Sequence, residues 1–383
     1  METIEDVIIV GAGLCGLATA LGLHRKGVKS VVLESSEVLR AAGFAFSTWT
    51  NAWKALEALG IADELRQHHL RLEGEGPEMR CVRRDLLLET LAKELPSDTI
   101  RYSSKVVLIE ESGNLKVLHL SNGSTLKTKV LIGCDGVSSV VSKWLGLKKP
   151  SFAGRSATRG FTEFPDGHGF NPEFVQLFGQ GFRAGIMPCD EKSMYWYFNW
   201  SSSSKDKEME KDATKMRQFV ITKMQEANVP HNFIQLIEKS DMGDSVSFPL
   251  KFRWPWELLW RNICKGNVTV AGDALHPMTP ELGQGGCAAL EDAVVLARCL
   301  AQALKGNDNG DAKEDEYVRV KSGLENYVAE RKWRDFDLVF TSYVFGSIQQ
   351  GDNAFTRFLT EKMLVGIMAR TKIKKTYYDC GKL

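Results

Sequence analysis

The chain has 383 residues, and its 49 lysines and arginines against 48 aspartates and glutamates leave a formal net charge of +1. So small a charge gives no electrostatic footprint for nucleic acid or an anionic membrane, and no run reaches the roughly 18 apolar residues of a transmembrane helix. The length exceeds about 100–200 residues, so we expect one large enzyme fold or two interlocked domains, with a small molecule as the partner.

The eight cysteines stand at irregular intervals and form no C-x-x-C pair, and no secretory leader precedes the first predicted strand. This pattern indicates reduced thiols in the cytoplasm, and it argues against a disulfide framework or a zinc site. The last three residues, Gly381-Lys382-Leu383, only approximate the Ser-Lys-Leu peroxisomal signal, so a peroxisomal location is the weaker alternative.

The first predicted elements are a strand, a glycine turn, a helix and a second strand between Val7 and Ser35. In such a turn, a first glycine permits the tight bend, a second lets a pyrophosphate approach the backbone, and a third lets the helix pack on the strand. The helix, expected from Leu17 to about Lys26, offers free N–H groups at its start. The residues of this turn are Gly11, Gly13, Leu14, Cys15 and Gly16.

Glu34 ends the second predicted strand, about 20 residues after the turn. A carboxylate at this place can accept hydrogen bonds from a ribose 2′-hydroxyl, and it would repel the 2′-phosphate of NADP. The turn therefore suits FAD or NAD, and an ordinary glycine-rich turn is the alternative.

The middle of the chain shows two different sequence patterns. Residues 105–136 predict a meander of strands with a hairpin turn at Asn122-Gly123. From residue 151 to about residue 261, aromatic-rich alternation predicts an antiparallel sheet, with a helix over residues 213–227. At Gly266 the pattern of strand, loop and helix seen in the first part returns.

The fold class that follows is α/β with two domains. A Rossmann-like domain of residues 1–150 and 263–345 is interrupted by an antiparallel β-sheet substrate domain of residues 151–262. Residues 346–383 form a C-terminal helical tail. Its apolar stripe is interpreted as a packing surface, with a partner or membrane surface as the alternative. The stripe consists of Phe358, Met363, Leu364, Ile367 and Met368.

Two later segments distinguish FAD from NAD. Asp135-Gly136 and Gly272-Asp273 each follow a predicted buried strand. An aspartate at the carboxyl end of such a strand faces the crevice where a doubly wound sheet binds its ligand, and there it can bond ribose or ribityl hydroxyls. Taken alone, each is better interpreted as an Asx turn that ends a strand. Together and in this order, the two segments favour FAD.

These motifs, with "GDALHP" and "GQGG" in the last of them, carry a resemblance that runs from Val7 to about Arg334. The chain resembles the single-component FAD-dependent monooxygenases of the para-hydroxybenzoate hydroxylase-like group. It looks closest to salicylate hydroxylase and zeaxanthin epoxidase relatives of plant type. The resemblance implies FAD as cofactor, NAD(P)H as transient reductant and O2 as co-substrate. It also implies a flavin C4a-hydroperoxide that hydroxylates, epoxidises or oxidatively decarboxylates a small aromatic or isoprenoid-like substrate.

The resemblance also implies roles for single residues. Glu34 would bind the adenosine ribose, while Arg83, with Arg40 as a second contact, would approach the phosphate or ribityl region of the flavin. Asp273 would bond the ribityl or pyrophosphate part, and Asp135 would serve both FAD and the visiting nicotinamide. The isoalloxazine would be lined by Pro280, Gly283, Gln284, Gly285 and Gly286.

Ser142 departs from the family pattern, which often has an arginine seven residues after the aspartate of the Asp-Gly motif, and this weakens a nicotinamide-binding assignment there. No second complete GxGxxG unit is present, and Gly179-Gln180-Gly181 is interpreted as a hairpin turn. NAD(P)H would therefore visit a groove, as in this family, and would have no domain of its own.

A long amphipathic helix is predicted to begin near Gly286, and its positive end would face the N1–O2 side of the reduced flavin. His276 is interpreted as loop structure, with a general base as the alternative. No side chain is assigned as catalytic acid or base, and the sequence indicates neither a Ser/His/Asp triad nor a metal site.

The substrate is expected between the flavin and the aromatic sheet, because alternate residues of a strand share a face. Core packing is the alternative for each aromatic candidate. The candidates are Gln176, Phe178, Met187, Trp196, Phe198 and Trp200.

Two other functions remain open on this sequence. One is a flavin oxidoreductase that inserts no oxygen, and the other is a non-catalytic escort or binding protein that has kept the fold and lost the flavin.

Overall fold

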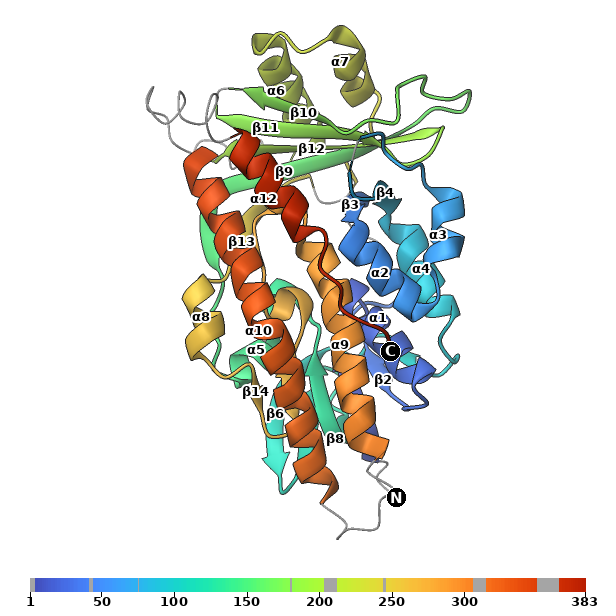
Figure 1. Cartoon of the computed structure of the whole chain (residues 1–383), viewed down its shortest axis with the longest axis vertical. Coiled ribbons are helices and arrows are strands. Elements are labelled where there is room, and N and C mark those ends of the chain that lie inside the picture. The colour runs from blue at the N-terminus through green and yellow to red at the C-terminus, as the bar shows by residue number, and fades with distance from the viewer. Residues whose placement is uncertain are drawn as a thin grey trace.

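The computed structural model describes residues 4–40, 44–74, 76–179, 181–202, 212–243, 246–305, 315–349 and 365–383. Within these ranges the strands form two large sheets and a two-stranded ribbon (Figure 1). The strands are β1 (Ile4–Val10), β2 (Val31–Leu33), β3 (Ala45–Trp49), β4 (Met79–Arg83), β5 (Ile100–Arg101), β6 (Val106–Ser112), β7 (Leu115–Leu120), β8 (Thr125–Gly133), β9 (Ser151–Glu163), β10 (Val175–Gly179), β11 (Phe182–Pro188), β12 (Ser193–Ser201), β13 (Phe248–Phe252), β14 (Cys264–Lys265) and β15 (Val268–Val270).

The helices lie on both sides of the first sheet and beyond the second. The α-helices are α1 (Leu14–Arg25), α2 (Thr50–Leu59), α3 (Ala62–His68), α4 (Arg84–Lys93), α5 (Val140–Trp144), α6 (Ala213–Glu226), α7 (His231–Glu238), α8 (Pro255–Trp260), α9 (Gly285–Lys305), α10 (Glu316–Gln349) and α12 (Val365–Lys375). Short 3-10 helices are η1 (Gly136–Ser138), η4 (Gly272–Ala274) and η5 (Pro280–Leu282).

The first sheet has a parallel centre, in the order β15, β8, β1, β2, β5. The antiparallel strand β14 borders β15, and β6 and β7 continue from β8 as the predicted meander. Val7 to Val10 in β1 are all buried, because both faces of a parallel sheet are covered by other elements. This is why the sequence there is an unbroken apolar run.

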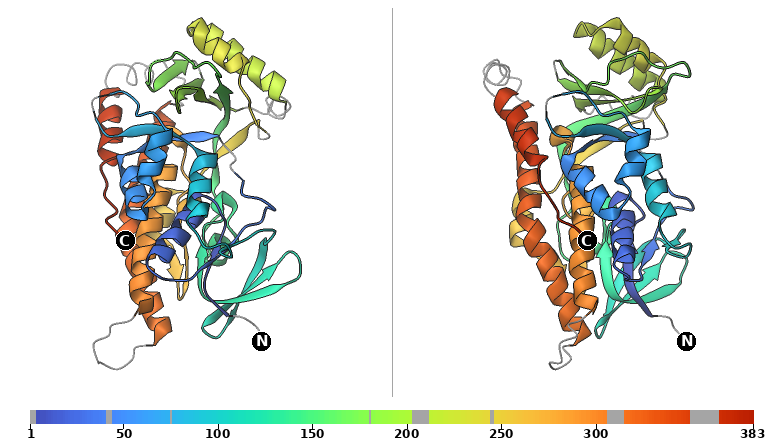
Figure 2. Two further views of the ribbon diagram at one scale, coloured as in Figure 1. Left: turned by 90° about the vertical axis from the view of Figure 1, so that its right-hand side faces the viewer. Right: turned by 45° about the vertical axis from the view of Figure 1, so that its right-hand side comes forward.

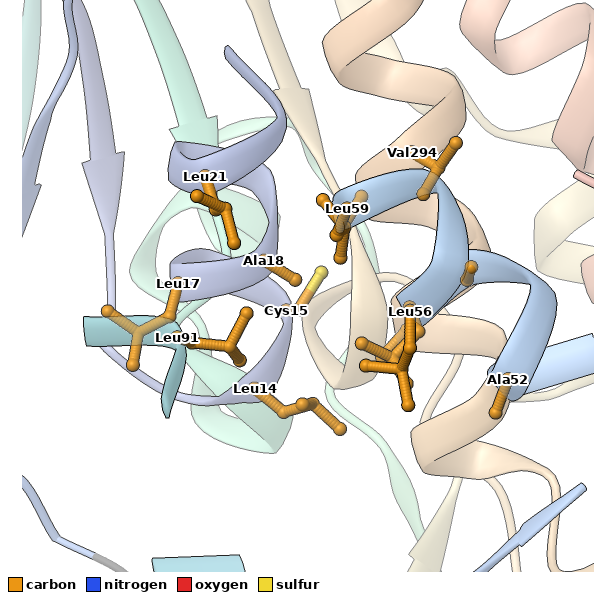
Figure 3. Close-up of a cluster of buried hydrophobic side chains, with 14 of the residues drawn as sticks. Leu14, Cys15, Leu17, Ala18, Leu21, Ala52, Leu56, Leu59, Leu91 and Val294 are labelled. Carbon is orange, nitrogen blue, oxygen red and sulfur yellow. The ribbon is translucent and has the colours of Figure 1, made fainter. Parts of the chain in front are cut away.

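One large core joins the first helix to helices far away in the sequence. Figure 3 shows Cys15 and Ala18 of α1 pointing toward Leu56 and Leu59 of α2, with Val294 of α9 in the same cluster. Burying a leucine or valine side chain stabilises the fold by about 1.5–3 kcal/mol. The core therefore fixes α1 firmly against the part of the chain that returns after the second sheet.

The first helix begins three residues earlier than the sequence predicted. α1 starts at Leu14, not at Leu17, because Gly13 has an extended backbone and serves as its N-cap. The third glycine of the turn, Gly16, therefore lies inside the first helical turn. α9 likewise starts at Gly285, one residue before the predicted Gly286.

The second sheet is antiparallel, in the order β10, β11, β12, β9, β13. Helices α6 and α7 cover its outer face, and its inner face looks toward the parallel-sheet part of the molecule (Figure 2). The long helices α9 and α10 pack side by side along the length of the molecule (Figure 2).

The α/β prediction is confirmed, including its interruption: the parallel sheet takes strands from both sides of the antiparallel one in sequence order. Among the described residues, every helix is too short or too polar to cross a membrane. Phe358, Met363 and Leu364 of the predicted tail stripe lie outside the described residues. Ile367 and Met368 belong to α12, but their side chains lie outside the described part as well.

Candidate functional site

The predicted motif residues meet at one edge of the parallel sheet. Gly11 follows β1, Glu34 follows β2, Asp135 follows β8 and Gly272 follows β15. These strands are neighbours and parallel, so their carboxyl ends open onto the same crevice. The sequence reasoning placed these residues together, and the structure does so too.

Two of the three glycines in the turn leave no room for a side chain, and the third borders open space. A Cβ on Gly11 would lie 2.6 Å from the Cys134 carbonyl oxygen, and one on Gly16 would lie 1.9 Å from the Gly11 carbonyl oxygen. A Cβ on Gly13 would meet no atom within 4 Å. Gly13 therefore leaves open space at the positive N-terminus of α1, where an anion is stabilised.

Glu34 is held rigidly beside this turn. Its side chain is buried, and Oε2 accepts a hydrogen bond of 3.0 Å from the Ala12 N–H. Oε1 accepts from the Ser36 N–H at 2.8 Å, and the Arg40 guanidinium lies 3.5 Å away. Arg40 thus contacts the residue expected to hold the adenosine ribose, whereas the sequence analysis expected it beside Arg83 at the phosphate or ribityl region.

The two predicted aspartates differ in their surroundings. Asp135 accepts the Val140 N–H on Oδ2 at 2.7 Å, while its buried Oδ1 has no hydrogen-bond partner among the described residues. Burial raises the pKa of this carboxyl. Asp273 is exposed on η4. Its neighbour Gly272 has φ +60, and a Cβ there would lie 2.9 Å from the Cβ of Cys15.

Arg84 approaches the crevice where the sequence analysis named Arg83. Arg83 is bound to Asp85, with Nη2 2.7 Å from Oδ2, and its guanidinium lies 5.5 Å from the ring centroid of Phe161. The buried Nε of Arg84 has no hydrogen-bond partner in the described chain. Burial and the charge of Arg159 lower the pKa of Arg84, and the Asp273 carboxylate partly offsets them.

The sequence analysis named Arg83, although a second arginine, Arg84, follows it at the junction of β4 and α4. Only the backbone geometry of the strand-to-helix junction decides between them: Arg83 is the N-cap residue and Arg84 the first residue of α4. The Arg84 N–H donates to the Phe44 carbonyl at 2.6 Å. This bond orients the start of α4.

The loop before α9 is held close to β3. Gly283 has φ +62, and a Cβ on it would lie 2.8 Å from the Ser47 hydroxyl oxygen, while a Cβ on Gly286 would lie 2.7 Å from the ring of Phe46. Gln284 is almost fully buried, and its Oε1 accepts a 2.8 Å hydrogen bond from Asn51. Its Nε2 has no partner in the described chain. The loop therefore presents backbone and one amide at the N-terminus of α9.

His276, which the sequence analysis interpreted as loop structure, belongs to a buried ion network next to this loop. Its Nε2 lies 2.6 Å from Asp292 Oδ2, and the Gly272 N–H donates to the same oxygen at 2.8 Å. Burial alone would lower the pKa of His276, but the carboxylates of Asp292 and Asp335 outweigh it and raise the pKa to about 9. His276 is fully buried, so the charged imidazole braces the Gly272 turn.

Arg331 of α10 is the centre of the network. Its guanidinium donates to Asp292 at 2.7 Å, to Glu291 at 2.6 Å and to Asp335 at 2.9 Å. Glu291 in turn accepts from Asn51, the residue that holds Gln284. A continuous set of bonds therefore connects α10 with both ends of the loop.

Ser142, the departure noted in the sequence, has a structural contact of its own. It is buried, and its hydroxyl donates to the Ala274 carbonyl at 2.5 Å. α5 is thereby tied to the turn at η4. An arginine would not fit in this buried position without rearrangement.

The antiparallel sheet separates the predicted substrate residues onto two faces. Gln176 and Met187 lie on the inner face with Tyr195 and Tyr197, as the strand register shows. The side chain of Phe178 lies outside the described part of the chain. Gln176 and Met187 therefore lie on the face of the sheet that looks toward the parallel-sheet part of the molecule, where the substrate was expected.

The expectation of a substrate-facing position does not hold for Trp196, Phe198 and Trp200. They alternate with the inner residues of β12 and belong to the core under α6 and α7. Trp200 packs edge-on against Phe219 of α6, with ring centroids 5.9 Å apart. Alternation showed that they share a face, but it could not show which face the helices would cover.

Two family models and two plant monooxygenases match this chain. The family described as "FAD binding domain" matches residues 109–332, more than half of the chain, and the family described as "Lycopene cyclase protein" matches residues 6–165. Monooxygenase 2 of Arabidopsis thaliana is 50% identical over 406 residues, which cover 100% of this chain and 99% of that protein. Monooxygenase 1 of the same plant is 37% identical and covers 100% of both.

A solved structure has the same fold. Klebsiella pneumoniae HpxO, complexed with FAD and uric acid, superimposes with a TM-score of 0.79 over 97% of this chain and 96% of that one. The two sequences are 23% identical, so this likeness speaks for the fold alone.

Proposed function

Because this chain belongs to the single-component FAD-dependent monooxygenases, we propose that it consumes NAD(P)H and O2 to insert one oxygen atom into a small aromatic or isoprenoid-like molecule. Family membership supports the reaction class. The choice of reductant and substrate is our proposal.

One observation carries the proposal: three segments that hold predicted site residues each carry a buried polar atom without a partner among the described residues, and the glycine turn beside Asp135 is open. Asp135 Oδ1, Arg84 Nε and Gln284 Nε2 have no hydrogen-bond partner among the described residues, and Gly13 borders open space. A buried polar atom without a partner costs about 1–3 kcal/mol. A cofactor with hydroxyl, phosphate and ring-amide groups would satisfy all three atoms, so these residues fit FAD.

We propose the following contacts to FAD. Glu34 would hold the adenosine ribose, and the N-terminus of α1 at Gly13 would hold the pyrophosphate. Arg84 takes the role expected for Arg83, and Asp135 and Asp273 would bond ribityl hydroxyls. The isoalloxazine would lie along Pro280, Gly283, Gln284, Gly285 and Gly286.

Bound FAD supplies the electron transfer and oxygen activation that side chains cannot provide. The chain's own residues then have three tasks. The N-terminus of α9 at Gly285 stabilises negative charge beside it, because its first N–H groups have no partner within the helix. The inner face of the antiparallel sheet positions the substrate and excludes water. The ion network around Arg331 holds both ends of the loop before α9 in place.

We also propose a role for each domain of the chain. Residues 1–150 and 263–345 would bind FAD, residues 151–262 would cover the substrate, and residues 346–383 would complete the site. A cytoplasmic location is consistent with the eight cysteines, all of which are free thiols.

The proposal is tested by loading the purified protein with FAD and following NADPH and NADH oxidation across phenols, aromatic acids and alkenes under isotopically labelled O2. We expect one compound to stimulate oxidation, with little peroxide, and to gain one labelled oxygen atom.

Other outcomes would replace the proposal. Stimulated oxidation that never labels any product would indicate an oxidoreductase without oxygen insertion. A protein that stays colourless and takes up no FAD would indicate a non-catalytic escort.

A further inference from the structure

The C-terminal helix α12 brings a lysine to the junction of the two sheets. The Lys372 ammonium lies 5.2 Å from the ring centroid of Trp49 and 5.5 Å from that of Phe174. Trp49 ends β3 beside the loop before α9, and Phe174 directly precedes β10. Figure 1 shows α12 at the end of the antiparallel sheet, beside α10. One side chain of the tail thus contacts both parts of the proposed active site.

Trp49 connects Lys372 to the proposed flavin loop. The indole Nε1 of Trp49 would lie 3.4 Å from a Cβ on Gly283. This N–H is buried and has no hydrogen-bond partner in the described chain. An indole N–H is a donor only, so an acceptor is missing at this point.

Phe174 connects Lys372 to the inner face of the antiparallel sheet. Its ring lies 6.5 Å from that of Tyr197, where burial raises the pKa of the hydroxyl and the charge of Arg183 opposes this rise. Arg183 Nη2 donates to Gln176 Oε1 at 3.3 Å, and Nη1 to the Glu281 carbonyl at 3.5 Å. The guanidinium of Arg183 is therefore fixed in position, close enough to Lys372 for the two charges to repel.

The positive charge of Lys372 has no carboxylate partner within the described residues. Lys372 is half-buried, and its contacts within the described residues are with the two aromatic rings, not with a carboxylate or a hydrogen-bond acceptor. The Glu281 carboxylate acts on it, but Glu281 is already paired with Arg155. Burial and the charge of Arg183 lower the pKa of Lys372 to about 7. The two aromatic rings attract the cation, but they leave its three N–H donors unused.

We infer that Lys372 contacts the substrate, and that the substrate is a small organic anion whose charged oxygens lie between Lys372, Arg183 and the Trp49 N–H. This inference rests on the proposed function, because it places the anion beside the proposed flavin loop. It also gives the C-terminal helix a role: α12 supplies a second positive charge beside that of Arg183 on β11. A purely structural lysine would have been expected to reach solvent or a carboxylate.

The test compares charged and neutral probes of the same shape. FAD-loaded full-length protein is titrated with benzoate and benzamide, and with salicylate and salicylamide, at low ionic strength, while the flavin absorbance is recorded. The variants are Lys372→Met, Lys372→Arg and Lys374→Met. Lys374 is the matched control, because it is exposed on the same helix.

We expect at least one acid to bind about 10- to 100-fold more tightly than its amide, as charge-assisted hydrogen bonds predict. Lys372→Met should lose this preference, whereas Lys372→Arg and Lys374→Met should keep it. Equal binding of acids and amides by the native protein would overturn the inference, and so would a preference that survives Lys372→Met.

If Lys372→Met fails to retain FAD, two other measurements show whether Lys372 causes the preference for acids. They are acid and amide binding by Lys372→Gln and the pH dependence of acid binding by the native protein. The proposed function fails separately. A flavin-loaded protein that labels no product yet selects acids through Lys372 would refute oxygen insertion and keep the anion site.

Discussion

Tyr195 and Tyr197 of β12 face the parallel-sheet part of the molecule, whereas Trp196 and Phe198 of the same strand face α6 and α7. Each face fills the gap left by a glycine on a neighbouring strand. Trp196 lies over Gly160 of β9, where a Cβ would be 2.6 Å from its ring, and Tyr197 lies over Gly185 of β11, where it would be 2.3 Å. Aromatic residues at such spacing therefore do not by themselves mark a binding surface.

The two faces differ in what else they carry. The outer face is an apolar core of aromatic, aliphatic and methionine side chains, closed by two helices. The inner face carries Arg155, Arg159, Arg183 and Gln176 along its strands. Burying such groups is costly unless they are paired. The polar face is therefore the one that we assign to ligands, and the apolar face the one that holds the sheet together.

Truncating an outer aromatic should give the largest effect. Trp196 is fully buried, so Trp196→Ala should lower the free energy of unfolding by about 3–5 kcal/mol, from lost burial and the cavity left behind. Urea denaturation measures this change. Tyr197→Phe, its inner neighbour, is the control and should change stability by less than about 1.5 kcal/mol. Equal losses in both variants would remove the distinction between the faces.

Arg84 should give the next largest effect, since it adjoins the inner face at Arg159 and Tyr195. Arg84→Met should raise the Kd for FAD by about 10- to 100-fold, because it removes a charge-assisted contact. Fluorescence titration of the apoprotein with FAD measures this. Arg83→Met should have a far smaller effect, because Asp85 already binds Arg83. A larger loss in Arg83→Met would restore the original sequence prediction.

The pH dependence of acid binding should show a smaller change. Lys372 is positive below its pKa of about 7 and neutral above it, so the affinity for benzoate should fall as pH rises, by about 10-fold from pH 6 to pH 8. The facing charges are Arg183 from β11 and Glu281 from η5. Lys372→Arg keeps its charge and should remove the pH dependence. A flat profile in the native protein would contradict the role of Lys372.

Gln176 should give the smallest effect. Its contact with Arg183 is 3.3 Å long and partly exposed, so Gln176→Leu should change stability by about 0.5–1.5 kcal/mol. Its effect on benzoate binding should stay below that of Lys372→Met. A larger effect than that of Lys372→Met would move the centre of the anion site from α12 to β10.

Much of the site could be predicted from the sequence, because its parts are local. Gly11, Gly13 and Gly16 are required by a tight turn and a close helix, and Glu34, Asp135 and Asp273 each follow an apolar run at a strand end. Strand order in a doubly wound sheet then brings these ends to one crevice. The start of α1 at Leu14 was missed because an N-cap in extended conformation leaves no distinct pattern when it is glycine.

Other features depend on contacts between distant segments. The sequence of β12 determined that Trp196, Phe198 and Trp200 share a face, but only the packing of α6 and α7 decided that this face is the outer one. The sequence places two arginines at the junction of β4 and α4, and only the tertiary structure pairs Arg83 with Asp85 and leaves the Nε of Arg84 without a partner among the described residues. Lys372 lies in a polar tail segment, and only the tertiary structure places it against Trp49 and Phe174. Local spacing determines turns and strand ends, whereas burial and pairing arise only when separate elements meet.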